Sequence, residues 1–346
     1  MAPAKKSAAV AKKPKKAAVK KVRLALIGAG GMANGMHYPS LAEMPDVEMA
    51  AICDIVEDKL NATADKFGIE KRYSDYKKMI EEVAPDAVYV LMPPHHLFDI
   101  VIHILNQKLH CYIEKPPGIT SEQTRQMAKL AEKQGVIGMA AFNRRYIPLM
   151  RQCKEKVLAG GEINQVVSTF YKQHDAGAYY GGAIDILSCD AVHAVDALRF
   201  MGGDVVDCCS SVRSLGKDFD TSFTAMVEFE SGAIGVLLAN WQTGGRVHQF
   251  EMHAHSASAF IDPDDKAVLH LNGKLNAETI TAVEAAGGRE EKYYNYGFYG
   301  ENRHFVDCIK SGKQPETSFA DAVKTMELVD LIYASNMSSS HSNRQM

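Results

Sequence analysis

A run of apolar residues that ends abruptly in glycines constrains this chain more than any other feature. Leu24–Ile27 is apolar, and Gly28-Ala-Gly30-Gly-Met-Ala33 follows at once. This order predicts a buried parallel strand, a tight turn and a helix, with the G-x-G-x-x-A spacing typical of dinucleotide-binding folds. Gly28 permits the turn, Gly30 has no Cβ to block a pyrophosphate, and Ala33 lets the helix lie close to the strand. The helix N-terminus would then aim its free N–H groups at the phosphates.

A carboxylate at the end of the next strand supports this interpretation. The segment 47–53 is apolar and strand-like, and Asp54 follows it directly. An acid at this position binds the two ribose hydroxyls of NAD and repels the 2′-phosphate of NADP. Ile55 and Val56 offer no compensating positive charge. The sequence therefore favours NAD(H) over NADP(H).

The composition is that of an ordinary globular protein with an acidic body. The 346 residues are 46% hydrophobic and 23% charged, and this length predicts about two domains. Residues 1–21 contain eight lysines and no acid, so the remainder carries 39 − 8 = 31 basic against 42 acidic residues. An acidic body argues against nucleic acid as the main ligand.

The terminal segments and the cysteines indicate in which cellular compartment the protein works and say little about its fold. The lysine-rich segment 1–21 lacks apolar periodicity and a secretory core, so we expect a disordered tail. Weak anion binding or targeting is the alternative for this tail, and 338–346 should be frayed. No apolar run reaches the ~20 residues of a membrane span. The seven cysteines contain no C-x-x-C pair, which favours a reducing, cytoplasmic location over disulfides or zinc.

Strand-like and helix-like segments alternate through residues 22–145. This alternation predicts an α/β class with an N-terminal Rossmann domain, a doubly wound parallel sheet whose ligands bind beyond the carboxyl ends of the strands. From 146 to 337 long alternating strands predict an α+β domain with a large open, mostly antiparallel sheet and closing C-terminal helices. The expected strands of this second domain are 166–171, 205–212, 221–229, 233–241 and 247–255, with helices at 147–158, 184–201, 299–310 and 319–334.

Two places in the chain could carry chemistry. Lys115, in Glu114-Lys115-Pro116, ends the fifth strand and would enter the crevice near the nicotinamide, unless it is a surface residue at a strand end. Asp190 and His193 lie three positions apart, so they share one helix face. A carboxylate beside an imidazole holds its tautomer and supports proton transfer near neutral pH. A structural network between domains is the alternative, above all for Asp196.

The combination of these motifs resembles the Gfo/Idh/MocA oxidoreductases, the glucose–fructose oxidoreductase and inositol dehydrogenase group. The resemblance covers about residues 22–336 and rests on the glycine turn, Glu114-Lys115-Pro116, Arg144-Arg145-Tyr146-x-Pro148 and His193-x-x-Asp196. It implies NAD(P)-dependent redox chemistry on sugars and polyols, with Lys115 and His193 as catalytic residues. The family carboxylate commonly stands four positions before the histidine, where this chain has Cys189, so Asp190 would have to replace it.

From the resemblance and the strand ends we expect a set of binding residues. The cofactor contacts expected are Gly28, Gly30, Gly31, Met32, Ala33, Asp54, Met92, Pro93, His96, Glu114 and Lys115. The substrate contacts expected, with sheet packing as the alternative for each, are Asn143, Arg144, Tyr171, His174, Tyr179, Trp241 and Arg246. No metal site is expected, because His253 and His255 lack a nearby pair of carboxylates.

The leading functional hypothesis is an NAD-dependent oxidoreductase that acts on a secondary alcohol or ketone of a sugar, polyol or sugar derivative. His193 would accept the hydroxyl proton beside Lys115, and Asp190 would orient His193. The alternative is a glycoside hydrolase that oxidises, eliminates and re-reduces with recycled NAD. A non-catalytic NAD sensor is less consistent with the presence of both Lys115 and His193. The second sheet should join copies of the chain into a homodimer or homotetramer.

Overall fold

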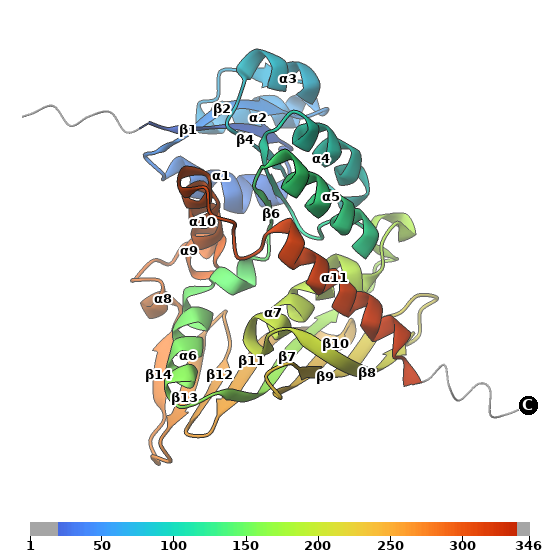
Figure 1. The fold of residues 1–346 in the computed structure, drawn as a ribbon, viewed down its shortest axis with the longest axis vertical. Helices are drawn as coiled ribbons and strands as arrows, with labels where there is room; N and C mark the ends of the chain where they lie inside the picture. The colour runs from blue at the N-terminus through green and yellow to red at the C-terminus, as the bar shows by residue number, and fades with distance from the viewer. Residues whose placement is uncertain (1–19, 338–346) are drawn as a thin grey trace, which may run out of the picture.

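The computed structural model describes residues 20–337, which form a parallel-sheet domain above a large open sheet (Figure 1). The predictions for the two tails therefore lie outside the described residues, except for Lys20 and Lys21. The first sheet has the order β3-β2-β1-β4-β5-β6 and is entirely parallel. Its strands are β1 (Val22–Ile27), β2 (Val47–Cys53), β3 (Arg72–Tyr73), β4 (Ala87–Val90), β5 (His110–Ile113) and β6 (Gly138–Ala140).

Helices cover both faces of this sheet, so the predicted Rossmann arrangement is confirmed. One face packs against α3 (Tyr76–Val83), α4 (Leu97–Asn106) and α5 (Ser121–Gln134). The other face packs against α1 (Tyr38–Ala42), α2 (Glu57–Phe67) and, from the far end of the chain, α10 (Phe298–Ser311). Alternate side chains of β1 point to the two cores, because neighbouring residues of a strand face opposite ways. Short helices η1 (Ala33–His37, a π-turn), η2 (Pro94–His96) and η3 (Asn143–Tyr146) complete the domain.

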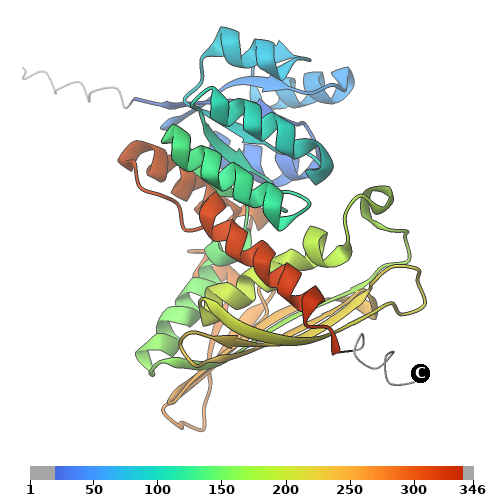
Figure 2. The same ribbon diagram turned by 45° about the vertical axis from the view of Figure 1, so that its right-hand side comes forward.

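The second sheet has eight strands in the order β14-β13-β12-β11-β7-β10-β9-β8. All its pairs are antiparallel except β7 with β10. The strands are β7 (Ile163–Gln173), β8 (Val205–Arg213), β9 (Ser222–Phe229), β10 (Ile234–Asn240), β11 (Gln242–Ala254), β12 (Ala257–Ile261), β13 (Lys266–Leu271) and β14 (Glu278–Thr281). The last three strands are short and were not predicted. One face of the sheet carries α6 (Pro148–Ala159) and α7 (Val192–Gly202), and the other is bare (Figure 2).

The C-terminal helices tie the two domains together. Two short helices, α8 (Ala282–Ala285) and α9 (Lys292–Asn295), follow β14 and precede α10, and α11 (Phe319–Ala334) crosses from the Rossmann domain to the second sheet (Figures 1 and 2). Between α10 and α11 the chain passes β6, where Ala140 N donates to Thr317 O at 2.9 Å and Met139 forms an antiparallel bridge with Ser318. A boundary at residue 145 therefore divides the chain by sequence order only. The helix α10 comes after that boundary, yet it packs into the same core as the Rossmann strands.

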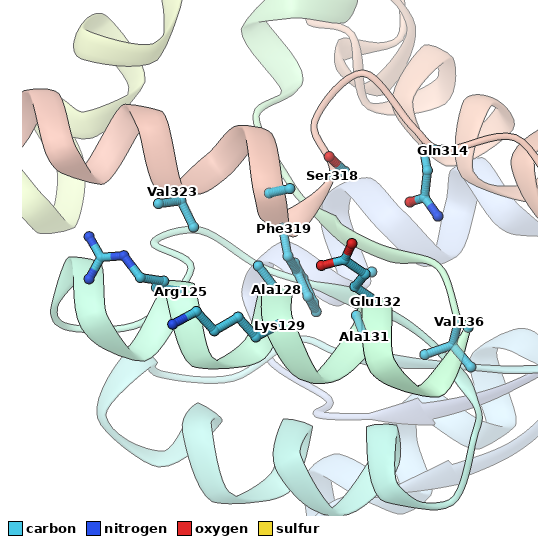
Figure 3. A pocket seen from close by; sticks show the side chains of 13 residues that line it. Arg125, Ala128, Lys129, Ala131, Glu132, Val136, Gln314, Ser318, Phe319 and Val323 are labelled. Atoms are coloured by element: carbon cyan, nitrogen blue, oxygen red, sulfur yellow. The ribbon is translucent and has the colours of Figure 1, made fainter.

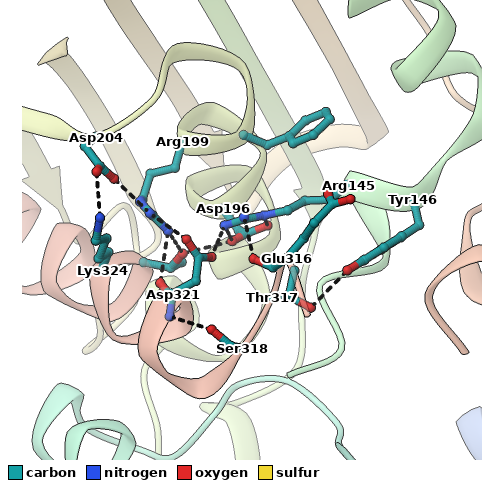
Figure 4. A network of polar contacts seen from close by, with 12 residues as sticks. Arg145, Tyr146, Asp196, Arg199, Asp204, Glu316, Thr317, Ser318, Asp321 and Lys324 are labelled. Atoms are coloured by element: carbon teal, nitrogen blue, oxygen red, sulfur yellow. Dashed lines mark hydrogen bonds and ion pairs between the residues drawn. The ribbon is translucent and has the colours of Figure 1, made fainter. Parts of the chain in front are cut away.

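A buried ion network lies where η3, α7 and α11 meet (Figure 4). Asp196 is completely buried and accepts from Arg145 Nε at 2.8 Å and from Arg145 Nη2 at 2.6 Å. Thr325 Oγ1 donates to the same carboxylate at 2.8 Å, and Arg145 also pairs with Asp321 at 2.7 Å. This arrangement supports the structural alternative for Asp196, because its oxygens are used in joining three elements.

Candidate active site

The glycine turn leaves room for a dinucleotide. Gly28 has φ +104°, and a Cβ there would lie 2.2 Å from the carbonyl oxygen of Leu91, so a larger residue would clash with β4. Cβ atoms on Gly30 or Gly31 would meet no atom within 4 Å. The backbone of these two glycines therefore faces open space, as a bound pyrophosphate requires. The helix beyond starts with a π-turn at Ala33, a residue that is itself buried, whereas Met32 is exposed.

Asp54 is held against this turn by the backbone. Its Oδ2 accepts from Ala29 N at 2.7 Å, and its Oδ1 accepts from Val56 N at 2.8 Å. Each carboxylate oxygen can accept a second hydrogen bond. The geometry thus fits ribose hydroxyls beside the glycine turn, and NAD is the group that this donor and acceptor set suits.

The carboxyl end of β4 lies next to the turn, since Leu91 N donates to Ile27 O at 2.8 Å. Met92, Pro93 and His96 follow, and the last two are exposed at this edge of the sheet. The neighbouring His95 ring lies 5.2 Å from the ring of Tyr180, a residue of the second domain. The edge of the sheet that is expected to bind the cofactor is therefore also in contact with the second domain.

Glu114, at the end of β5, is buried and already has a partner. Its Oε1 lies 2.9 Å from His37 Nε2, and its Oε2 accepts from Lys115 N at 3.0 Å. Burial alone would raise the pKa of the Glu114 carboxyl, but His37 and Lys115 outweigh it and lower this pKa. A second carboxyl nearby, Glu301 of α10, is fully buried, and burial followed by the charge of Glu114 raises its pKa well above the usual value. Burial thus favours the protonated form of the Glu301 carboxyl.

Lys115 reaches across the domain boundary. Its Nζ donates to Cys189 O at 3.2 Å and lies 3.9 Å from Asp190 Oδ1. The structure thus brings the fifth Rossmann strand and the predicted helix of the second domain to one place. The local helix is irregular, because Leu187–Ala191 forms a π-turn, η5, before α7 begins. Such turns change which side chains face a site.

Asp190 is bonded to three side chains. Tyr179 OH donates to its Oδ2 at 2.9 Å, and Lys172 forms a close ion pair with the same oxygen. Burial would raise the pKa of Asp190, yet Lys115, Lys172 and Tyr179 together lower it to about 2. The carboxylate is therefore charged throughout the physiological range.

His193 is buried and is held by Arg144, not by Asp190. Arg144 Nη1 lies 3.1 Å from His193 Nε2. Because a guanidinium can only donate, Nε2 accepts and Nδ1 carries the proton. Burial first, then the charges of Arg144 and Lys115, lowers the pKa of His193 well below 6.5, so the ring is neutral. Among the described contacts of Asp190 none involves His193, so the expected orienting bond between them is wrong.

The expected substrate residues fall into three groups. His174 and Tyr179 lie at the site, with their rings 5.0 Å apart. Arg144 is buried beside His193, and Asn143 supports it by accepting from its Nη1 at 2.7 Å. Arg246, at the other wall, donates to Tyr296 OH and pairs with Asp264.

Two expected contacts need correction. Trp241 is fully buried, and its Nε1 donates to Tyr179 OH at 3.1 Å, so it positions Tyr179 instead of facing a substrate. Tyr171 lies on β7 between Phe170 and Lys172, which both face α7 and the site. Because strand side chains alternate, Tyr171 points to the opposite face of the sheet.

Sequence reasoning missed three polar residues at this site. Lys172 is the residue after the expected Tyr171. Strand alternation predicts that one of these two neighbours faces the site, but the sequence does not show which one. His37 and Tyr296 reach the site from elements distant in the chain, for which no local signal exists, whereas His248 was expected from the sequence beside Arg246 as a residue that could reach a polar or anionic substituent.

A groove of about 580 Å³ lies elsewhere, between α5 and the start of α11 (Figure 3). Arg125, Lys129 and Phe319 line it, and none of the residues above does. Within residues 20–337 no cluster of three or more histidine, cysteine or acidic side chains could hold a metal ion. None of the helices in this range combines the length and apolar character needed to cross a membrane.

Comparison with known proteins gives the same picture over most of the chain. Residues 22–142 match the family model "Oxidoreductase family, NAD-binding Rossmann fold", and residues 155–260 match the "GFO/IDH/MocA C-terminal domain". The rhizopine catabolism protein MocA of Rhizobium meliloti is 32% identical over 289 residues, which is 77% of this chain and 87% of that protein. Myo-inositol 2-dehydrogenase of Thermotoga maritima is 26% identical and covers 87% of this chain and 92% of its own length.

Solved structures agree in fold. A dehydrogenase from Chromobacterium violaceum has a TM-score of 0.84 at 21% identity, covering 94% of this chain and 98% of that one. Levoglucosan dehydrogenase in complex with NADH and levoglucosan has a TM-score of 0.80 at 21% identity, covering 91% and 97%. The chain is thus a member of the Gfo/Idh/MocA family, an oxidoreductase with an NAD-binding Rossmann domain.

Proposed function

We propose that this protein is an NAD-dependent dehydrogenase or reductase that interconverts a secondary alcohol and a ketone on a sugar, polyol or sugar derivative. One observation carries the proposal: Lys115 of the Rossmann domain meets the Asp190 turn of the second domain beside the buried His193. This meeting point lies at the carboxyl edge of the parallel sheet, where such folds bind ligands. Relatives named myo-inositol 2-dehydrogenase and scyllo-inositol 2-dehydrogenase (NAD(+)) support the substrate class.

When bound, NAD supplies the hydride acceptor or donor, and the residues of the chain handle the proton. The Lys115 ammonium donates a hydrogen bond to the reacting oxygen and stabilises negative charge as the O–H bond breaks. His193, neutral because of its burial, accepts the proton at Nε2 once Arg144 releases that atom. Asp190 keeps Lys115 and Lys172 in place instead of touching His193.

The cofactor is proposed to lie along the glycine turn with its ribose on Asp54. Its contacts would be those expected from the sequence: Gly28, Gly30, Gly31, Met32, Ala33, Asp54, Met92, Pro93, His96, Glu114 and Lys115. Glu114 would act indirectly, because it is hydrogen-bonded to the backbone N of Lys115 and to the ring of His37 and so fixes their positions. The open space above Gly30 supports this path.

We further propose that copies of the chain associate through the bare face of the second sheet, as a homodimer or homotetramer. Met226, Ile234 and Phe260 are large apolar side chains exposed on strands of this sheet. Met226 and Ile234 line one shallow hollow of this face, and apolar side chains gathered on an exposed surface mark association sites. The domain division proposed remains 22–145 and 146–337. All seven cysteines are free thiols, which supports a reducing compartment such as the cytoplasm.

The test compares Lys115→Met and His193→Ala with Lys129→Met, which alters an exposed lysine of α5. NAD reduction at 340 nm over a panel of sugars, polyols and aryl glycosides should fall by at least ~100-fold in the first two variants, as expected for loss of acid–base catalysis. NAD binding, measured by titration calorimetry, should persist in all three. Near-normal turnover in both site variants would refute the assignment. Aglycone release without net absorbance change would instead establish the glycosidase alternative.

A further inference from the structure

Positive charge exceeds negative charge at the proposed site. Lys115 and Lys172 share one carboxylate, Asp190. Arg246 and Lys292 share another, Asp264. A third carboxylate at this site, Glu114, is bonded to His37 and to the backbone of Lys115.

Arg144 is the cation without a carboxylate. It is 8% exposed, and no acidic oxygen of the described residues lies within ion-pair distance, 4.0 Å, of its guanidinium. Its Nη1 contacts two neutral groups, Asn143 Oδ1 and His193 Nε2, and its Nε has no hydrogen-bond partner. Buried charges are normally paired, because removal from water is costly. Asp190 and Glu301 act on Arg144 only from beyond ion-pair distance, so its guanidinium can pair with the anionic group of a ligand.

Two aromatic rings bring the cations together. Lys172 Nζ lies 4.9 Å from the Phe170 ring centre, and Arg246 Cζ lies 6.0 Å from it. Arg246 Cζ is also 5.8 Å from the ring centre of Tyr296, over which Arg144 Cζ lies at 5.0 Å. Arg246 thus approaches both rings, and its charge is near enough to Arg144 to help lower the pKa of that guanidinium.

The floor of this cluster is a histidine with no partner for either nitrogen. His248 is 2% exposed, stacks on Phe170 at 4.0 Å, and has no hydrogen bond at Nδ1 or Nε2. Arg246 lies on the same side, because its Cζ is 6.0 Å from the centre of the Phe170 ring on which His248 stacks. Unpaired buried nitrogens are rare in folded proteins and indicate a place where a ligand or water supplies the bond.

We propose that the substrate carries a carboxylate, bound by Arg144 and Arg246, and that the protein therefore acts on a sugar acid rather than a neutral sugar or polyol. This inference rests on the proposed function, since the reacting hydroxyl must still reach Lys115 and His193. Arginine suits the role because its planar fork matches a carboxylate with two parallel hydrogen bonds.

The contact between Arg144 and His193 adds a reason why an acid is required. Arg144 occupies the nitrogen that must accept the proton. A substrate carboxylate offers the guanidinium a charged partner in place of a neutral imidazole, and bonds to charged acceptors are roughly twice as strong. Binding of the acid thus frees Nε2, whereas a neutral substrate leaves it blocked. The carboxylate and the reacting hydroxyl consequently lie at the same end of the substrate.

The test uses pairs of ligands that differ only in charge. A panel of aldonates and uronates is compared with the primary amide of each, in kcat, KM and, with NADH-loaded protein, binding by calorimetry. The wild type should prefer the acid by ~10- to 100-fold in kcat/KM, the effect of one charged hydrogen-bonding pair. Part of this preference should appear in kcat, because the amide does not draw Arg144 from His193.

Variants then separate recognition from folding. Arg246→Gln, at a half-exposed position, should lower kcat/KM for the acid by ~10-fold or more and change the amide by less than ~3-fold. Arg246→Lys should recover part of the loss, because it restores charge without the fork. Arg144→Met should abolish the preference for the acid, with folding checked by thermal melting. Arg151→Gln, an exposed arginine of α6 paired with Glu316, is the control.

The outcomes distinguish the inference from the function beneath it. Equal or better turnover of amides or neutral polyols overturns the acid requirement and leaves the dehydrogenase intact. If no compound reduces NAD, the proposed function fails on this panel. In that case the carboxylate-binding site formed by Arg144 and Arg246 is still supported if the acids bind the NADH-loaded protein and the amides do not, and it is refuted if no acid binds.

Discussion

Replacing Asp196 with asparagine would test whether the buried ion network of Figure 4 holds the two domains together. The carboxylate is completely buried and accepts three hydrogen bonds, two from Arg145 and one from Thr325. Removing one partner of a buried ion pair costs about 3–5 kcal/mol. Arg145 would keep Asp321 at 2.7 Å, so we expect the lower end, about 3 kcal/mol.

Urea unfolding can be followed by the fluorescence of Trp241, the only tryptophan, which is fully buried. With a slope of ~3 kcal/mol per molar urea for a chain of this size, the midpoint should fall by ~1 M. The control is Asp204→Asn in the same network. Asp204 bonds Arg199 and Lys324, but its side chain is 42% exposed, so its loss should cost less than ~1 kcal/mol. Equal midpoints for the two variants would refute the reasoning.

Three further predictions follow from the site. Asp54→Ser should weaken NAD binding by ~10-fold or more and narrow the NAD-to-NADP affinity ratio, measured by calorimetry; an unchanged ratio would remove Asp54 from ribose recognition. Burial lowers the pKa of His248 well below 6.5, so the unfolded chain binds more protons and stability falls as pH drops below 6.5. His248→Phe should therefore make the free energy of unfolding, measured by urea titration at several pH values, fall by up to ~1.4 kcal/mol less per pH unit. An unaltered pH dependence of this free energy would contradict the prediction. Burial raises the pKa of Glu301, so the folding stability linked to its protonated form is fully present below pH ~4.5 and is lost as the pH rises. Glu301→Gln, which stays neutral, should therefore be more stable than wild type at pH 8. A destabilised variant would count against a protonated Glu301.

The parts of the fold that sequence predicts are those set by neighbouring residues. Gly28 was identified because its positive φ and the close approach of β4 are needed within a few positions of an apolar strand. Asp54 and Lys115 were identified because each directly follows a buried strand. In a parallel sheet the carboxyl ends of strands share one edge, so local patterns were enough to bring these residues together.

The remaining features depend on register and on distant contacts. A shift of one residue on β7 exchanges Tyr171 for Lys172, and nothing local determines which of them faces α7. The π-turn at Leu187–Ala191 alters the helix geometry, so spacing alone could not show that Asp190 bonds Lys172 and not His193. Strands β12 to β14 are short and partly exposed, which leaves a weak pattern in the sequence.

The bridge between β6 and Ser318 has a consequence for synthesis of the chain. Until residue 318 leaves the ribosome, the outer edge of β6 has no partner and the face that α10 covers stays open. The interval from residue 140 to residue 318 takes roughly 10 to 35 s at bacterial or eukaryotic elongation rates. During that time the nascent Rossmann sheet exposes apolar surface and a free strand edge, the two features through which partly folded chains associate.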